Sequence, residues 1–203
     1  MAQLPQLIIA TRNSPKTGEI RLILGHLFDV ADVSAIPHAP EIEETGTTFL
    51  ENARLKALGI SACTDSWVLA DDSGLEVDAL GGRPGVYSSS FGGEEGNHSL
   101  NNAKLLHEMT NVENRTARFL CTLVLAKNGQ EHGVYRGTVE GTIAHQPSGG
   151  GGFGYDPLFI PAGHQASMAE LGAEIKSTLS HRALAVRDFA TSFPGSAPPS
   201  WIK

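Results

Sequence analysis

The order of hydrophobic and polar residues at the start of the chain predicts a strand, a polar loop and an amphipathic helix. The apolar run Gln6–Ala10 is typical of a short buried strand. The polar segment Thr11–Lys16 follows, and Pro15 suits the first turn of a helix that Asn13 or Ser14 would cap. Apolar residues then recur at the spacing of one helical face, at Ile20, Ile23, Leu24 and Leu27.

A second helix is predicted to begin near Thr48. Thr48 and Glu51 have the spacing of a capping box, in which each residue binds the other's backbone N–H. Asn52 and Lys56 are four residues apart and therefore share one face of this helix. Its apolar stripe would consist of Leu50, Ala53, Ala57 and Ile60.

A buried strand is predicted over Trp67–Ala70, and we interpret the acidic segment Asp71-Asp72-Ser73-Gly74 as its end. The residues Leu75–Leu80 alternate with period two, which indicates a second extended segment. Glycine and proline turns follow at Gly81-Gly82 and Pro84-Gly85.

The rest of the chain predicts two further helices and a hairpin. Asn128-Gly129 is a strong two-residue hairpin signal and would return the chain through Val134–Ile143. The strand before it alternates at Ala117, Phe119, Cys121, Leu123 and Leu125. A helix over residues 99–109 would bury Leu100, Ala103, Leu106 and Met109. The last helix would bury Ala183, Val186, Ala190 and Phe193.

Helices alternate with strands at first, and two long strands then pair through a tight turn. This order predicts an α/β or α+β domain built on a mixed sheet. The 203 residues can bury a proper core, and no segment resembles a linker between independent domains. We therefore expect residues 1–203 to form a single domain, with 194–203 as a loosely ordered end.

Composition and charge narrow the function classes. The net charge of −7 disfavours binding to a nucleic-acid backbone, which depends on Lys and Arg. No apolar run reaches the roughly 18 residues of a membrane span, and we expect no signal peptide. Two cysteines, Cys63 and Cys121, are too few for a disulfide framework, so we expect reduced thiols and a cytoplasmic protein.

Two acidic clusters offer the hard oxygen ligands that Mg²⁺ prefers. Asp71 and Asp72 follow an apolar strand, where α/β folds place ligands. Glu41, Glu43 and Glu44 form the second cluster. Each cluster also has an ordinary structural interpretation, an Asx turn for the first and a solvated loop for the second.

Several segments are suited to binding a nucleotide. The loop Thr11–Lys16 leads into a helix N-terminus, which favours anions, although it lacks the glycines of a Walker loop. Lys176, His181 and Arg182 lie within seven residues, and the alternative is ordinary helix-surface charge.

The glycine-rich segment Gly149–Asp156 brings Phe153 and Tyr155 next to flexible backbone. Aromatic faces of this kind stack on bases, with a contribution of about 1–3 kcal/mol per base. The alternative is a flexible loop whose aromatic rings belong to the core.

Taken in order, five segments resemble the inosine triphosphate pyrophosphatase family, which comprises the noncanonical purine nucleoside triphosphate (dITP/XTP) pyrophosphatases. They span nearly the whole chain, and the long central segment is specific. The five are ATRNSPK at 10–16, EETGTTFLENARLKA at 43–57, ADDSGLEVDALGGRPGVYS at 70–88, GGFGYDPLF at 151–159 and LSHRALA at 179–185.

The resemblance implies an α/β fold with an elongated mixed β-sheet flanked by helices, and two lobes with a nucleotide cleft between them. It also implies a homodimer. The implied reaction is the Mg²⁺-dependent hydrolysis of dITP, ITP or XTP to the monophosphate and pyrophosphate, which cleanses the nucleotide pool.

The resemblance also implies roles for individual residues. Glu43 and Asp72 would hold Mg²⁺, and Asp72 would also accept the proton. A donor from His181 or Arg182 to the 6-oxo group of the purine would reject ATP, because adenine carries a donor there. The residues implied to bind substrate are Thr11, Arg12, Asn13, Ser14, Pro15, Lys16, Lys56, Ser73, Phe153, Gly154, Tyr155, Asp156, Lys176, His181 and Arg182.

The chain departs from the family's usual sequence at Arg12, where many relatives have glycine, and at Ser89-Ser90, where Ala-Arg is usual.

Two other functions compete with hydrolysis of noncanonical purine nucleoside triphosphates. A Maf-like pyrophosphatase would act on pyrimidine nucleotides, but its opening motif differs from residues 10–16. A nucleotide-binding module without turnover would not need Glu43, Lys56 and Asp72 together.

Overall fold

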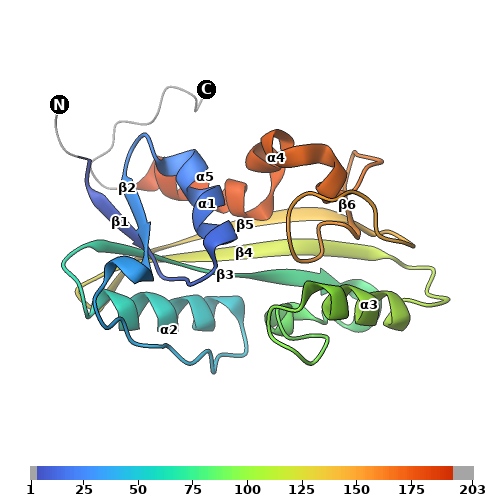
Figure 1. Ribbon diagram of the computed structural model, residues 1–203, viewed down its shortest axis with the longest axis horizontal. Coiled ribbons are helices and arrows are strands. Elements are labelled where there is room, and N and C mark those ends of the chain that lie inside the picture. Colours follow the sequence, from blue (N-terminus) through green and yellow to red (C-terminus); the bar gives the residue numbers. More distant parts are fainter. Residues whose placement is uncertain (1–3, 194–203) are drawn as a thin grey trace. The chain divides into compact units, whose positions relative to one another are not determined.

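The computed structural model describes residues 4–193, which form a six-stranded mixed sheet and five α-helices (Figure 1). The strand order is β2-β1-β3-β4-β5-β6; β1 runs parallel to β2 and β3, and β6 runs antiparallel to β5. The elements are β1 (Gln6–Ile9), α1 (Ser14–Leu24), β2 (Asp29–Asp32), α2 (Phe49–Ser61), β3 (Trp67–Val77), α3 (His98–Glu108), β4 (Thr116–Lys127), β5 (Gln130–Ile143), β6 (Phe159–Pro161), α4 (Met168–Leu179) and α5 (His181–Ser192).

The described chain divides into two compact units. Unit 1 comprises residues 4–72, 121–137 and 182–193, and unit 2 comprises residues 73–120 and 138–181. Strands β3, β4 and β5 contribute residues to both units. The single domain inferred from the sequence stays a prediction, and the tail expected at 194–203 lies outside the described residues.

Helices cover both faces of the sheet in unit 1, with α1 and α5 on one face and α2 on the other (Figure 1). Successive side chains of a strand point to opposite faces, so Leu7 and Ile9 pack with α1 and α5 whereas Ile8 packs with α2. A strand that is buried on both faces is usually a nearly continuous apolar run. This burial explains the short apolar runs that predicted β1 and the start of β3.

Local sequence signals in unit 1 are confirmed. Asn13 caps α1, because its side chain accepts a hydrogen bond from the backbone N–H of Lys16. Thr48 and Glu51 form both hydrogen bonds of the capping box at the start of α2. Asn128-Gly129 has positive φ at both residues, as a tight hairpin turn requires, and β4 and β5 lie side by side.

The interpretation of Asp71-Asp72-Ser73-Gly74 as a strand end is wrong, because β3 continues through this segment from Trp67 to Val77. Asp71 and Asp72 are both buried. Strands seldom carry buried carboxylates in their interior, but here cationic side chains from the helices neutralise both of them. Those cations lie far away in the chain, so the segment by itself resembles a turn.

The buried face of α3 differs from the predicted one. Of the four predicted positions, Met109 is buried and Leu106 is partly buried, but Leu100 and Ala103 are exposed. Asn101 and Leu105 are buried in their place. The Asn101 side chain donates to the Ser89 carbonyl and accepts from the backbone N–H of Gly92. These two bonds satisfy its amide, so a polar residue occupies the core position that the apolar pattern assigned to its neighbour.

Three elements were not predicted. β2 and β6 are only four and three residues long, too short for a clear pattern. In α4, Gly172 has a non-helical backbone with φ of 82° and interrupts the periodicity. No helix within residues 4–193 is both long and apolar enough to cross a membrane.

Candidate functional site

The predicted site residues form two groups, one in each unit. The unit 1 group contains the loop before α1, Lys56 of α2, and the two aspartates of β3. The unit 2 group contains Ser73, the glycine-rich loop and residues of α4.

The loop before α1 is ordered by its own side chains. Thr11 Oγ1 accepts a hydrogen bond of 3.0 Å from the backbone N–H of Asn13, which in turn caps the helix. Ser14 and Pro15 form the first turn, and Arg12 is exposed. The predicted strand, loop and helix are therefore present, with the helix N-terminus directly after the loop, where backbone N–H groups favour an anion.

Asp71 is fully buried between two cations. Its Oδ1 accepts from Lys16 Nζ at 2.6 Å, and its Oδ2 accepts from Arg182 Nε at 2.7 Å. Burial alone would raise the pKa of Asp71, but Arg182 and Lys16 outweigh it and hold the pKa well below the ordinary value. Asp71 is therefore a permanent anion that fixes Lys16 at the start of α1. The Cys121 thiol lies 3.3 Å from the same Oδ2, and burial, the largest cause, raises its pKa, which disfavours the nucleophilic thiolate form.

Arg182 is 1% exposed, and its guanidinium donates to two carboxylates. Besides Asp71, it contacts Glu19 of α1 through Nη1. Burial opposes the charge of Arg182, but Asp71 and Glu19 raise its pKa overall, so it stays charged. The predicted contact of Arg182 with the nucleotide stays a prediction.

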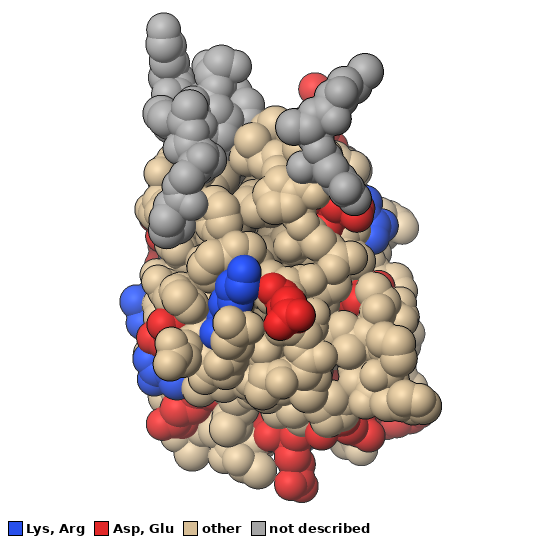
Figure 2. Space-filling model, turned by 90° about the vertical axis from the view of Figure 1, so that its left-hand side faces the viewer, with Lys and Arg blue, Asp and Glu red and all other residues tan. Residues whose placement is uncertain are grey.

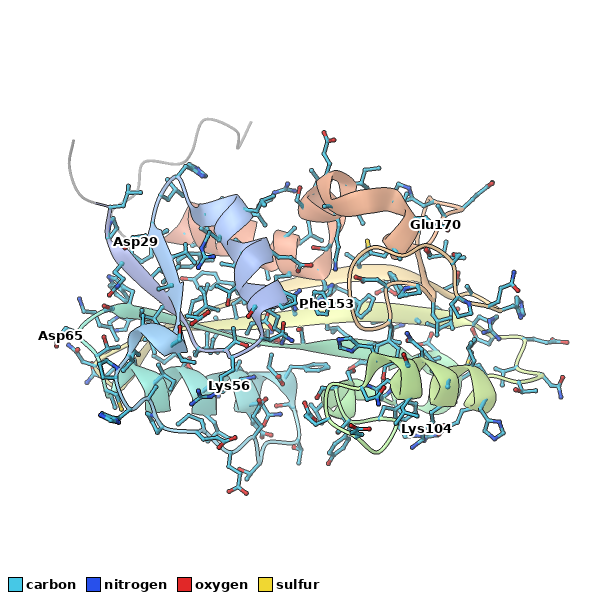
Figure 3. The ribbon with its side chains drawn as sticks, viewed as in Figure 1. Asp29, Lys56, Asp65, Lys104, Phe153 and Glu170 are labelled. Atoms are coloured by element: carbon cyan, nitrogen blue, oxygen red, sulfur yellow. The ribbon has the colours of Figure 1, made fainter. Side chains whose placement is uncertain are left out.

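Asp72 faces Lys56, which extends from α2 toward β3 (Figure 3). Lys56 Nζ lies 3.1 Å from Asp72 Oδ1 and 2.8 Å from a carboxylate oxygen of Glu44. Burial is the main cause that raises the pKa of Asp72 to about 6. The nearby charges of Lys56 and Lys16 lower this pKa, whereas the charge of Glu44 raises it further. The other oxygen, Oδ2, is buried and has no hydrogen-bond partner among residues 4–193.

The carboxylates of unit 1 are not arranged as a complete metal-binding site among the described residues. Within residues 4–193, no group of three or more His, Cys, Asp or Glu side chains is close enough to hold a metal ion. Glu43 is exposed, and it is Glu44 that pairs with Lys56. The unpartnered Asp72 Oδ2 is nevertheless a suitable ligand for a hard cation, because a buried carboxylate oxygen without a partner is costly. The residues present therefore fit Mg²⁺ through Asp72, with a second carboxylate from the 41–44 segment.

In unit 2, a buried ion pair orders the glycine-rich loop. Asp156 Oδ2 accepts from Lys176 Nζ at 2.6 Å and from the backbone N–H of Phe153 at 2.8 Å. Lys176 Nζ also lies 4.4 Å from the centre of the Phe153 ring, a cation–π contact. Phe153 lies on the glycine-rich loop (Figure 3), and these contacts hold its ring. Its side chain is half-buried, so part of the ring remains accessible.

The other predicted residues of unit 2 lie deeper or have different partners. Tyr155 is buried in the core and donates to the Ser88 carbonyl, so only Phe153 presents an accessible ring. His181 is buried and stacks on Phe119, with ring centres 4.7 Å apart. The Gly154 carbonyl accepts from Asn102 of α3, which sequence analysis had not identified.

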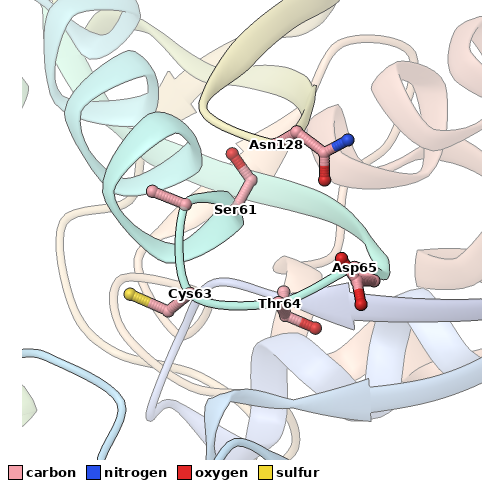
Figure 4. A pocket seen from close by; sticks show the side chains of 6 residues that line it. Ser61, Cys63, Thr64, Asp65 and Asn128 are labelled. Carbon is pink, nitrogen blue, oxygen red and sulfur yellow. The ribbon is translucent and has the colours of Figure 1, made fainter.

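The surface of unit 1 also carries a pocket (Figure 4). Ser61, Cys63, Asp65 and Asn128 contribute side chains to it, from the end of α2, the following loop and the β4–β5 turn. It contains none of the predicted site residues. On the face shown in Figure 2, the visible Lys and Arg side chains lie among Asp and Glu, without a broad basic surface among the described residues.

The sequence analysis did not identify Glu19 and Asn102 as site residues, and it named Glu44 only as part of an acidic cluster, without its contact to Lys56. The spacing of Lys16 and Glu19, three residues apart in one helix, was a usable signal, because such residues share a helical face. The partners of Glu44 and Asn102 lie 12 and 52 residues away, and no local pattern indicates them.

Comparisons with known proteins agree with this architecture. Residues 7–192 match the model of the Ham1 family. The chain is 52% identical over 183 residues to a dITP/XTP pyrophosphatase of an Exiguobacterium species, covering 90% of this chain and 93% of the relative. A dITP/XTP pyrophosphatase of Streptococcus pyogenes is 51% identical over 194 residues, and the match covers 93% of this chain but 58% of that longer relative.

Solved structures give the same result. The Ham1 protein of Staphylococcus aureus superimposes with a TM-score of 0.80 at 39% identity, covering 89% of this chain and 94% of the other. A HAM1 protein of Coxiella burnetii gives a TM-score of 0.84 at 36% identity, covering 93% and 98%. These similarities confirm the resemblance that the sequence motifs indicated and the α/β fold with a mixed sheet. The chain belongs to the Ham1 family.

Proposed function

We propose that this protein hydrolyses noncanonical purine nucleoside triphosphates (dITP, ITP and XTP) to the monophosphate and pyrophosphate, in a Mg²⁺-dependent reaction. The relatives named as dITP/XTP pyrophosphatases support the substrate class. The observation that carries the proposal is the environment of Asp72, a buried carboxyl with a pKa raised to about 6, an unpartnered oxygen and a lysine beside it. Perturbed carboxyls of this kind are typical of catalytic sites.

The unit 1 group would bind the triphosphate and support the chemistry. Hydrolysis forms a bond between a water oxygen and the α-phosphorus, breaks the bond to the leaving pyrophosphate, and transfers the water proton to the Asp72 carboxylate. The residues 11–16, with the N-terminus of α1, would bind phosphate oxygens. Lys16 and Lys56 would stabilise the negative charge that develops on the leaving group.

Asp72 and Glu43 are the proposed ligands of Mg²⁺, and Glu44 directly follows Glu43 in the chain. When bound, the ion would neutralise charge on the phosphate oxygens. The buried Oδ2 of Asp72 supports this role, since it has no hydrogen-bond partner in the described structure. Glu43 is exposed and therefore accessible to a metal–nucleotide complex.

The unit 2 group would bind the purine base. Phe153, held by Asp156 and Lys176, would stack on the base, and Ser73 and the backbone of Gly154 would contact the nucleotide. A donor to the 6-oxo group would select inosine and xanthosine nucleotides over ATP. Because carboxylates engage the Arg182 guanidinium, we assign this donor to His181.

We also propose a homodimer in the cytoplasm, as the resemblance implies. The unpaired thiols of Cys63 and Cys121 support a reducing compartment. Light scattering in solution tests the homodimer: a particle of twice the 21.5 kDa chain mass supports it, and a single-chain mass contradicts it. Fractionation of cells that express the tagged chain tests the cytoplasmic location.

The decisive experiment is a nucleotide panel (ITP, dITP, XTP, GTP, ATP, dTTP and UTP), with Mg²⁺ or with a chelator, and with every product resolved. Monophosphate plus pyrophosphate from ITP, dITP and XTP, with ATP nearly untouched and no turnover in chelator, is the expected result. Turnover of dTTP or UTP would favour the Maf-like function. Release of inorganic phosphate and diphosphate would contradict attack at the α-phosphorus, and binding without turnover would favour a regulatory module.

A further inference from the structure

The glycine-rich loop of unit 2 places Phe153 between two glycines with left-handed backbone. Gly152 has a φ of 73° and Gly154 has a φ of 64°. Glycine can adopt more backbone conformations than any other residue, so the local sequence does not by itself fix the direction of the Phe153 ring. The ring therefore depends on contacts from outside these three residues.

Hydrogen bonds hold the backbone on both sides of the Phe153 side chain. Before it, the backbone N–H of Phe153 donates to Asp156 Oδ2 at 2.8 Å, a bond within the loop itself. After it, the Gly154 carbonyl accepts from Asn102 Nδ2 at 3.0 Å. Asn102 belongs to α3 and lies 52 residues earlier in the chain, so this second bond ties the loop to a regular helix.

One face of α3 contacts the loop at two consecutive residues. His98 lies four residues before Asn102, and residues at this spacing share a helical face. The centres of the His98 and Phe153 rings are 6.2 Å apart, with an angle of 43° between the ring planes. Asn102 contacts the next residue, Gly154. Helix α3 therefore lies beside the part of the loop that is proposed to bind the base.

Within residues 4–193, the Asn102 amide leaves part of its hydrogen-bonding capacity unused. Its Oδ1 is buried and has no hydrogen-bond partner there. Turning the amide around would place Oδ1 against the Gly154 carbonyl, so that two acceptors would face each other. A buried oxygen without a partner costs at least as much free energy as one hydrogen bond contributes. Asn102 should therefore add little to the stability of the fold, which favours a role in placing the loop.

We propose that Asn102 is a positioning residue for base recognition: through the Gly154 carbonyl, it holds the loop so that the Phe153 ring faces the purine. This inference rests on the proposed function, in which Phe153 stacks on the base. It adds a residue to which neither the sequence motifs nor the comparisons assign a role. Asn102 itself is not expected to touch the nucleotide.

Asn102→Leu tests the inference, because leucine has a similar size but no hydrogen-bonding group. Binding of dIMP, measured by calorimetry, should weaken about fivefold, the lower end of what stacking on an aromatic side chain contributes. Binding of inorganic pyrophosphate with Mg²⁺ and the urea midpoint of unfolding should stay at their wild-type values. Hydrogen exchange of the backbone amides in residues 149–156, followed by mass spectrometry, should become faster.

Asn114→Leu is the matched control, since it makes the same change at an exposed position of unit 2. It should leave dIMP binding and the hydrogen exchange of the loop unchanged. Equal weakening of dIMP and pyrophosphate binding in Asn102→Leu, together with a lower urea midpoint, would indicate a general loss of structure and overturn the inference.

A double-mutant cycle with Phe153→Ala decides whether Asn102 acts through the ring. If it does, Asn102→Leu causes little further loss of dIMP affinity once the ring is absent. Losses that multiply in the double variant would contradict the proposed role.

These binding and exchange measurements need no turnover, so they separate the inference from the proposed function. If the wild-type protein binds dIMP but hydrolyses none of the nucleotides, the proposed reaction fails, and the cycle still decides the role of Asn102. If turnover is as proposed but Asn102→Leu binds dIMP and exchanges its loop amides like the wild type, only the inference about Asn102 fails. A wild-type protein that binds no dIMP would overturn the base-binding role of Phe153 and this inference with it.

Discussion

Asp71 and Asp72 are neighbours in β3, and their carboxyl groups have opposite electrostatic environments. Consecutive side chains of a strand point to opposite faces, so Asp71 faces the cations of α1 and α5 and Asp72 faces Lys56 of α2. Two cations hold the pKa of Asp71 well below its ordinary value, whereas burial raises the pKa of Asp72 to about 6. One carboxylate is thereby fixed as a structural anion and the other can take up a proton.

Asp72→Asn should reduce the turnover of dITP by at least about 100-fold, because the amide cannot accept the proton of the attacking water. The measurement is the initial rate of pyrophosphate release at saturating Mg²⁺. Asp65→Asn, in the pocket of Figure 4, is the control and should keep normal turnover. Near-normal turnover in a folded Asp72→Asn protein would remove Asp72 from the mechanism.

Asp71→Asn should destabilise the fold by about 3–5 kcal/mol, the cost of breaking a buried ion pair from one side. Arg182 would keep its charge in the core and lose its Nε partner. Urea unfolding followed by circular dichroism gives the free energy. For comparison, Glu131→Gln breaks the exposed pair with Arg54 and should cost less than about 1 kcal/mol. Equal effects of the two changes would contradict the structural role of Asp71.

Lys176→Met should impair recognition of the base while leaving the phosphate side intact. The change removes the cation of Asp156 and the contact with the Phe153 ring, so the ring is no longer held in place. We expect KM for dITP to rise about tenfold, equivalent to about 1.4 kcal/mol, with unchanged affinity for pyrophosphate.

Lys104→Met is the matched control for Lys176→Met. Lys104 Nζ also lies over an aromatic ring of unit 2, 4.5 Å from the centre of Phe91, but outside the predicted site (Figure 3). The KM of the Lys104→Met variant for dITP should match that of the wild type. An unchanged KM in both variants would indicate that Lys176 does not position the base-binding ring.

Thr48→Ala should lower the free energy of unfolding by about 1 kcal/mol, the usual cost of losing a helix cap. The Thr48 hydroxyl accepts from the backbone N–H of Glu51, and Ser can make the same bond. Thr48→Ser should therefore have nearly wild-type stability by urea unfolding. A loss of similar size in the serine variant would show that the methyl group, rather than the cap, is responsible.

The sequence by itself determined the features that depend on residues close together in the chain. The caps at Asn13 and Thr48 and the turn at Asn128-Gly129 are local hydrogen-bond and backbone preferences. The alternation along β4 likewise identified one buried face of this strand, from Ala117 to Leu125, because side-chain direction in a strand has a fixed period. The quoted motifs were sufficient to identify the family.

Tertiary structure alone decided where buried polar groups could lie. β3 continues through Asp71 because Lys16 and Arg182, 55 and 111 residues away, neutralise its charge. Asn101 enters the core of unit 2 because the backbone of the preceding loop satisfies its amide. A polar residue is stable inside a protein only when its partners are present, and only the folded chain brings such distant partners together.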